Sequence, residues 1–150
     1  MKKLISQEQA IIAMIALLAV VLIFHTLVLT GMIPYTIVWA GKIESLQDMK
    51  RLEVISICIN FFLIIPFLLK ARYIPNKIPN KILNAIILLL AVFFSLNTIG
   101  NLFAKSKFEL FFFTSITFIS AILCFRIVYS GKKRLSESLE IFNALEHKEY

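Results

Sequence analysis

Hydrophobic residues in this chain form four long runs without a charged side chain, separated by short segments that hold nearly all of the charges. The charge-free runs cover residues 9–41, 54–69, 82–104 and 110–125. A helix needs about 20 mostly apolar residues to cross the hydrocarbon layer of a bilayer, which is about 30 Å thick. The pattern therefore predicts four transmembrane helices, at about residues 10–30, 52–70, 82–103 and 109–129.

Local signals indicate where these helices begin and end. A serine followed three residues later by Gln, Asp or Glu favours a helix start, and this spacing occurs at Ser6 with Gln9, Ser45 with Asp48, and Ser106 with Glu109. Gly31 and Gly131 are expected to end the first and fourth helices. The repeated prolines of residues 74–81 (IPNKIPNK) predict a short turn. Short connections make successive helices antiparallel neighbours, so the predicted fold class is all-α, an antiparallel up-down-up-down four-helix transmembrane bundle.

The chain divides into a transmembrane domain, residues 1–131, and a tail, residues 132–150. Apolar residues recur in the tail at helical spacing, at Leu135, Leu139, Phe142 and Leu145. This spacing predicts a short amphipathic C-terminal helix. Such a helix either lies on the bilayer surface with its basic start, Lys132, Lys133 and Arg134, against anionic headgroups, or docks against a partner or a second copy.

The composition and the charge place the protein in a membrane and orient it there. Hydrophobic residues make up 59% of the chain, more than a soluble domain carries. The formal net charge of +7 does not indicate nucleic acid, because the basic residues stand singly or in short groups beside the apolar runs. With four spans, 11 of the 16 lysines and arginines fall on the side of the termini and five on the other. The richer side is expected in the cytoplasm, so both termini are predicted to be cytoplasmic.

The segment 33–41 (IPYTIVWAG) is apolar but too short to cross the bilayer. It follows the first predicted span, on the side opposite the termini. Aromatic rings favour the headgroup region, so Tyr35 and Trp39 are predicted interface anchors.

Polar residues within the spans gather in the half of the membrane that lies away from the termini. Those expected to face the bundle interior are His25, Glu53, Ser56, Asn60, Asn97, Asn101 and Thr114. Glu53, Ser56 and Asn60 share one helix face. Facing lipid would be costly for such groups, so they are expected to meet one another. One hypothesis is that they only hold the helices together; the other is that they line a polar cavity that binds a ligand.

Three functions remain open from the sequence. The first is binding or movement of a small amphiphile, lipid or solute through that cavity. The second is a non-catalytic accessory or assembly subunit of a larger membrane complex, as a homo-oligomer or with another membrane protein. The third is an intramembrane enzyme with His25 and Glu53 as an acid–base pair. No zinc-ligand spacing, phosphate-binding loop or nucleophile motif is present, so neither metal nor cofactor is expected, and catalysis is the least favoured of the three.

Two stretches carry a resemblance to known sequences: residues 33–61 (IPYTIVWAGKIESLQDMKRLEVISICINF) and residues 97–112 (NTIGNLFAKSKFELFF), together with the turn between them. They resemble an uncharacterised family of small bacterial four-span membrane proteins. That family usually has a Gly-Gly-Arg-like sequence after the Trp, where this chain has Ala40, Gly41 and Lys42. The resemblance implies a multi-pass protein of the bacterial cytoplasmic (inner) membrane and implies no activity, substrate or cofactor.

Overall fold

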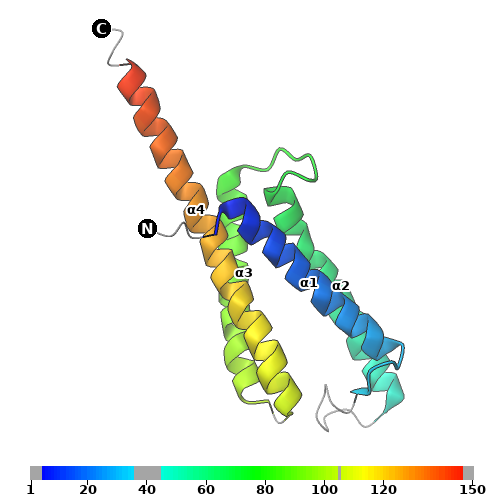
Figure 1. Cartoon of the computed structure of the whole chain (residues 1–150). Helices are drawn as coiled ribbons and strands as arrows, with labels where there is room; N and C mark the ends of the chain where they lie inside the picture. Colours follow the sequence, from blue (N-terminus) through cyan, green and yellow to red (C-terminus); the bar gives the residue numbers. More distant parts are fainter. Residues whose placement is uncertain (1–4, 36–44, 105, 147–150) are drawn as a thin grey trace.

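The computed structural model describes residues 5–35, 45–104 and 106–146, with side chains up to residue 130. Long helices dominate these segments (Figure 1), and they are α1 (Gln7–Leu29), α2 (Leu46–Lys70), α3 (Asn80–Leu102), a π-helical turn η2 (Glu109–Phe113) and α4 (Thr114–Glu146). The helices pack antiparallel, which confirms the predicted all-α four-helix bundle.

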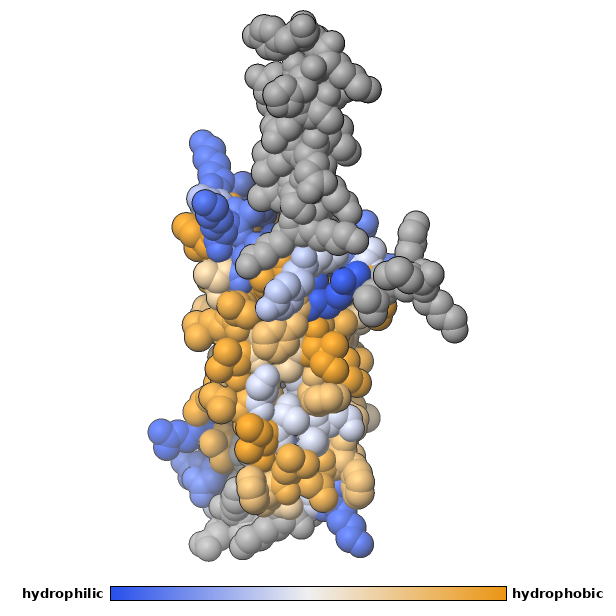
Figure 2. Space-filling model, turned by 90° about the vertical axis from the view of Figure 1, so that its left-hand side faces the viewer, coloured by the Kyte–Doolittle hydropathy of each residue, from blue (hydrophilic) through white to orange (hydrophobic). Residues whose placement is uncertain are grey.

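The outer surface of the bundle matches a hydrocarbon environment. Each of the four helices is long and apolar enough to cross a bilayer, with the fourth span at Glu109–Ser130. Large apolar side chains point outward along every span, for example Phe62 on α2 and Leu89 on α3, which are 72% and 69% exposed. Figure 2 shows the resulting hydrophobic belt between two hydrophilic ends. The chain is therefore an integral membrane protein with four spans.

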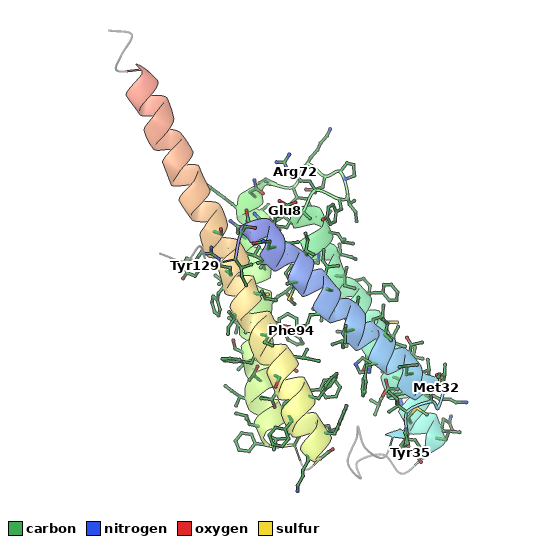
Figure 3. All side chains as sticks on the ribbon, in the orientation of Figure 1. Glu8, Met32, Tyr35, Arg72, Phe94 and Tyr129 are labelled. Carbon is green, nitrogen blue, oxygen red and sulfur yellow. The ribbon has the colours of Figure 1, made fainter. Side chains whose placement is uncertain are left out.

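The bundle has two ends, which we call proximal, where α1 begins, and distal, where α1 ends. The proximal end holds the start of α1, the end of α2, the start of α3 and α4 near Ser130. The distal end holds the end of α1, the start of α2, the end of α3 and η2. Figure 3 places Glu8, Arg72 and Tyr129 at the proximal end and Met32 and Tyr35 at the distal end.

The predicted helix starts are confirmed by hydrogen bonds. At α1, the Gln9 backbone N–H donates to the Ser6 hydroxyl, and the Gln9 side chain accepts from the Ser6 backbone, so both halves of the capping box are present. At α2, the Asp48 backbone N–H donates to the Ser45 hydroxyl at 3.1 Å. These contacts satisfy backbone groups that a helix start leaves without partners.

The predicted helix end at Gly131 is wrong. α4 continues without a break to Glu146, and Figure 1 shows it leaving the bundle along the direction of its span. A glycine inside a helix costs only about 1 kcal/mol relative to alanine. The following residues, 132–135 (KKRL), are strong helix formers, which outweigh that cost.

The four helices pack as two antiparallel pairs, α1 with α2 and α3 with α4. The pairs meet mainly where α1 contacts α4, whereas α2 touches α3 much less. The main core lies in the proximal half and draws on all four helices, with Met14, Phe67, Ile87 and Ile127 at its centre. Towards the distal end the α1–α2 pair diverges from the α3–α4 pair (Figure 1).

Candidate functional site

The buried face of α2 is unusual because half of it is polar. Its buried residues are Met49, Glu53, Asn60 and Phe67, and the last three are spaced by seven residues, which places them on one stripe of the helix. The buried residues of α1 and α3 are all apolar. A fully buried carboxylate within a membrane span is costly, so this stripe marks the candidate site.

Glu53 is paired with His25 of α1. The His25 Nδ1 lies 2.7 Å from the Glu53 Oε2, the carboxylate side chain is 0% exposed, and the imidazole side chain is 12% exposed. An ionised carboxylate only accepts hydrogen bonds, so in that state Nδ1 carries the proton of this bond. Protonation of Nε2 then decides whether the imidazole is neutral or cationic. The pair joins α1 to α2 and holds a titratable group between the helices.

Phenylalanine rings from α1 and from the start of the fourth span pack together next to His25. Phe24 precedes His25, and its ring lies 5.4 to 5.6 Å from the rings of Phe108, Phe112 and Phe113. The Phe113 ring also stacks on His25 at 6.3 Å. These aromatic contacts connect α1 to the start of the fourth span.

The π-helical turn η2 explains why three rings of one helix can meet Phe24. A π-helix closes its hydrogen bonds from residue i to i+5, so its turn is wider than that of an α-helix. Residues four and five positions apart, such as Phe108 with Phe112 and Phe113, then share one face of the helix. A regular α-helix would turn Phe113 away from Phe108.

Three buried side-chain oxygens among the described residues have no hydrogen-bond partner: Asn60 Oδ1, Thr114 Oγ1 and Ser120 Oγ. Other hydroxyls in the spans, such as those of Ser95 and Thr117, donate to the carbonyl four residues earlier. An unsatisfied buried polar group costs about 1 to 3 kcal/mol. These atoms are therefore positions where a polar ligand atom would be stabilising.

The antiparallel register assigns these oxygens to two levels. The His25–Glu53 bond sets the register of α1 against α2, and the Phe24–Phe113 contact sets that of α1 against α4. Counting along the helices from these contacts puts Thr114 near the level of Glu53. The same count puts Asn60 and Ser120 near one deeper level, about 10 Å closer to the proximal end at 1.5 Å per residue.

The residues that the sequence suggested for one polar layer fall into two groups. His25, Glu53 and Asn60 belong to the α1–α2 pair, and Ser56 lies half-buried on the same face of α2. On the α3–α4 pair, the Asn101 amide lies 3.5 Å from the Thr117 hydroxyl. That hydroxyl also accepts from Thr98 at 2.9 Å.

Asn97, also on α3, donates to its own helix at the Phe93 carbonyl. No described hydrogen bond links Asn97 or Asn101 to Glu53 within residues 5–35, 45–104 and 106–130. The two asparagines are thus satisfied inside their own helix pair.

Of the predicted interface anchors, Tyr35 is the one whose side chain the structure describes. Tyr35 is half-buried and packs against the distal cluster of Phe24, Val28 and Met49. Trp39 lies outside the described residues. Lys132, Lys133 and Arg134 lie in the helical part of α4, but their side chains are also outside the description. Their roles at the bilayer surface stay predictions.

Polar contacts at the proximal end differ in kind, because they join one helix pair to the other. The Gln7 amide donates to the Ile127 carbonyl at 2.9 Å, and the Arg126 guanidinium donates to the Ile5 carbonyl at 2.7 Å. The Lys70 ammonium donates to the Asn84 amide oxygen at 2.7 Å, which joins α2 to α3. These bonds fasten the two pairs at one end.

The sequence interpretation missed the aromatic cluster, although one signal was present. Phe108, Phe112 and Phe113 stand at spacings of four and five residues directly after a helix start. In a regular α-helix this spacing spreads over two faces, so only the π-helical turn brings the rings together.

Among the side chains described for residues 5–35, 45–104 and 106–130, no group of three His, Cys, Asp or Glu residues is placed to hold a metal ion.

No protein-family model, curated protein or solved structure matches this chain. The resemblance to small bacterial four-span proteins therefore stays a prediction, and the site is interpreted from its own geometry.

Proposed function

We propose that this protein binds a small amphiphile or lipid in the distal half of the bundle, with the polar group of the ligand between the two helix pairs. The observation that carries the proposal is the set of buried oxygens without partners, Asn60 Oδ1, Thr114 Oγ1 and Ser120 Oγ. Polar side chains that serve only to join helices satisfy one another, as Thr98 and Thr117 do. Oxygens that stay unsatisfied favour a binding role.

A ligand reaches this position only if the distal ends of the two pairs separate, because Glu53 is not exposed at all and Phe24 is only 7% exposed. The described bonds permit such a movement. The distal hydrogen bonds described for residues 5–35, 45–104 and 106–130, such as those of His25 with Glu53 and Thr98 with Thr117, join helices of one pair, and the pairs meet there through aromatic rings. The proximal bonds and the main core would act as the fixed end.

A photoreactive amphiphile tests the proposal. The purified protein in nanodiscs is labelled with a diazirine-bearing dodecyl compound, and the labelled residues are mapped by mass spectrometry. We expect labelling of α2 and α4 around Asn60 and Ser120 that excess unlabelled amphiphile removes. Uniform labelling of the lipid-facing residues, without competition, would overturn the proposal.

Variants make the test specific to the site. Asn60→Leu removes one of the oxygens without a partner and should reduce the competed labelling. Ser115→Ala is the matched control, since Ser115 is exposed and its hydroxyl bonds to the Phe111 carbonyl of its own helix. Its labelling pattern should equal that of the unaltered protein.

A role as an accessory or assembly subunit is the second candidate. It is favoured by the helical extension of α4 to Glu146, well past the end of the fourth span at Ser130. Removal of residues 132–150 would then release a partner or a second copy in crosslinking experiments while the bundle stays folded. A crosslinking pattern that is unchanged by the truncation would remove this candidate.

The orientation and the membrane belong to the proposal as well. The side of the termini carries 11 of the 16 basic residues, and the positive-inside rule supports cytoplasmic termini. We propose the bacterial inner membrane as the membrane that the protein spans. A reporter that is active only in the cytoplasm, fused after Tyr150, should be active. Activity of a periplasmic reporter at that position would reverse the assignment.

A further inference from the structure

We infer that the turn between α2 and α3 binds the phosphate group of an anionic phospholipid at the proximal end of the bundle. Four basic residues stand in this turn or at its ends: Lys70, Arg72, Lys77 and Lys81. The turn lies at the opposite end from the proposed amphiphile site, and its lipid binding does not depend on that site.

The basic residues of the turn carry positive charge without an acidic neighbour. No Asp or Glu occurs between Glu53 and Glu109 in the chain. The side chains of Arg72, Lys77 and Lys81 are exposed, and none of them forms an ion pair within the part of the chain that the structure describes. Glu8 of α1 shares this end (Figure 3), but it makes no described ion pair with the turn. Such a group of free cations beside membrane spans attracts anionic headgroups.

Lys70 places one of these charges between the two helices. Its half-buried ammonium donates to the Asn84 amide oxygen at 2.7 Å and to the Asn80 amide oxygen at 3.3 Å. Both acceptors are neutral, so these bonds do not compensate the charge. An ammonium group has three N–H donors, which leaves one beyond these two bonds for a phosphate oxygen.

Hydrogen bonds within the turn keep its cations together at the end of α2. The Asn76 side-chain amide donates to the Leu69 carbonyl at 3.1 Å and accepts from the Ile78 backbone N–H at 3.2 Å. The charge of Arg72 acts on the Lys70 ammonium as a like charge. A phosphate bound between Arg72 and Lys70 would replace this repulsion by attraction to both.

The backbone of Arg72 supports a role for its side chain. Arg72 adopts the left-handed conformation at φ +61°, which is unfavourable for a residue with a Cβ; the corresponding position after α1 is Gly31. The Arg72 guanidinium makes no hydrogen bond among the described residues that would explain an arginine at this position. A guanidinium binds phosphate oxygens through two parallel N–H donors, which gives the side chain a purpose.

The position of the turn favours the phosphate of a lipid over a soluble phosphate. The turn joins the ends of two membrane spans, so it lies at the level of the headgroups. Tyr73, Ile74 and Ile78 expose apolar surface beside the cations, and Ile65 on α2 and Ile82 on α3 are exposed on the adjoining spans. Acyl chains can pack on these side chains while the phosphate meets the turn.

Native mass spectrometry of the full-length, delipidated protein in a non-ionic detergent tests the inference. The probe is an equimolar mixture of dioleoyl phosphatidylglycerol and dioleoyl phosphatidylcholine, which share their acyl chains. We expect about tenfold more adducts with phosphatidylglycerol than with phosphatidylcholine. The assay has no insertion step, so any role of the basic residues in orienting the protein does not contribute. Equal adducts with the two lipids would overturn the inference.

A triple variant assigns the preference to the turn. Arg72→Gln, Lys77→Gln and Lys81→Gln together remove its exposed cations, and the preference for phosphatidylglycerol should fall to about twofold. A preference that stays at the level of the unaltered protein would contradict binding at this turn. The comparison of the two lipids on the unaltered protein still tests the inference if the variant does not fold.

A matched control separates a site from general attraction by net charge. Lys50→Gln, Arg51→Gln and Lys107→Gln remove the same number of exposed cations at the distal end, and the preference should stay unchanged. An equal loss in both triple variants would overturn the inference in favour of general attraction.

A soluble competitor separates the two sources of phosphate. Glycerophosphoglycerol has the headgroup of phosphatidylglycerol without acyl chains, and an excess of it should leave the lipid adducts in place. Displacement of the lipid by this compound would contradict the assignment of the site to a phospholipid.

Discussion

The proximal and distal halves of the bundle use the same kinds of side chain for opposite purposes. In the proximal half, apolar residues from all four helices form one core, and polar groups such as Lys70 and Asn84 tie one helix pair to the other. In the distal half, the buried apolar cluster draws on α1, α2 and the start of the fourth span. Its described polar bonds, such as His25 with Glu53, join helices of the same pair. The comparison teaches that described hydrogen bonds fasten the two pairs to each other at the proximal end, whereas aromatic rings join them at the distal end, which is where we propose that the bundle opens.

Unsatisfied polar atoms follow the same division. The oxygens of Asn60, Thr114 and Ser120 that have no partner lie in the distal half or at its border with the main core. A membrane helix can avoid this cost by using apolar residues, as α3 does along its buried face of Leu83, Ile87, Ala91 and Phe94. The cost is therefore concentrated where the proposed ligand binds.

The largest effect is expected in the proximal core. Phe67→Ala empties the position of a ring that is 0% exposed, and it should lower the free energy of unfolding by about 3 kcal/mol. The lipid-facing Phe62, on the same helix and 72% exposed, is the matched control, and Phe62→Ala should change stability little. Unfolding with SDS in mixed micelles measures both. Equal losses of unfolding free energy in the two variants would contradict the placement of the main core in the proximal half.

A smaller loss is expected at the distal polar pair. His25→Ala removes a hydrogen bond to a fully buried carboxylate and should cost about 2 kcal/mol. That exceeds the average of about 0.6 kcal/mol for polar contacts between membrane helices, because the acceptor is a carboxyl group that is not exposed. Thr26→Ala is the control, since the exposed Thr26 hydroxyl bonds only to the Leu22 carbonyl of its own helix. Unfolding with SDS measures both variants, and equal stability would contradict a stabilising role of the His25–Glu53 hydrogen bond.

Removal of an oxygen without a partner should have the opposite sign. Ser120→Ala should raise the free energy of unfolding by up to about 1 kcal/mol, because it deletes a buried hydroxyl that bonds to nothing. Ser95 lies near the same level on α3, and its hydroxyl bonds to the Ala91 carbonyl, so Ser95→Ala should bring no such gain. In the photolabelling assay, Ser120→Ala should bind less amphiphile despite its greater stability. A destabilised Ser120→Ala would show that the hydroxyl has a structural partner.

The smallest effect concerns the turns that end α1 and α2. Both follow the same hydrogen-bond pattern: the backbone N–H of the second residue past the helix end donates to the second-last helical carbonyl, and that of the third residue donates to the third-last. The distal turn uses Gly31 at φ +80°, but the proximal turn places Arg72 at φ +61°. Left-handed backbone is unfavourable for a residue with a Cβ.

Arg72→Gly should therefore stabilise the protein by about 0.5 kcal/mol, the strain relieved less the entropy that glycine loses on folding. Gly31→Ala is the reciprocal change and should destabilise by about 1 kcal/mol. A Cβ at Gly31 would meet no atom within 4 Å, so only the backbone conformation is tested there. The unfolding midpoints of the two variants, measured with heat or SDS, should shift in opposite directions. Changes of the same sign would refute this explanation.

The sequence predicted the spans well because their signals are local. Long charge-free runs defined four helices, and the serine caps at Ser6 and Ser45 marked two of their starts within a residue. The end of α4 was predicted wrongly at Gly131, since one glycine is a weak signal beside the strong helix formers that follow it.

The grouping of the polar residues could be predicted only in part. The shared face of Glu53 and Asn60 follows from their seven-residue spacing. Which partner each residue meets depends on helix rotation and on the neighbouring helix, which the spacing does not contain. For that reason Asn101 was placed with Glu53 but bonds to Thr117 instead. The convergence of the phenylalanines needed the π-helical turn, which has no clear sequence signal.

The distance between the helix pairs at each end tests the central claim most directly. Spin labels at Gln47→Cys and Leu102→Cys report on the distal end, and labels at Glu8→Cys and Lys81→Cys report on the proximal end; all four positions are exposed. The free cysteines are replaced by Cys58→Ser and Cys124→Ala. Double electron–electron resonance is recorded with and without the unlabelled dodecyl amphiphile. The distal distance should lengthen when the ligand is added while the proximal distance stays fixed. A distal distance that does not change, or an equal change at both ends, would contradict the division of the bundle into a closed end and an opening end.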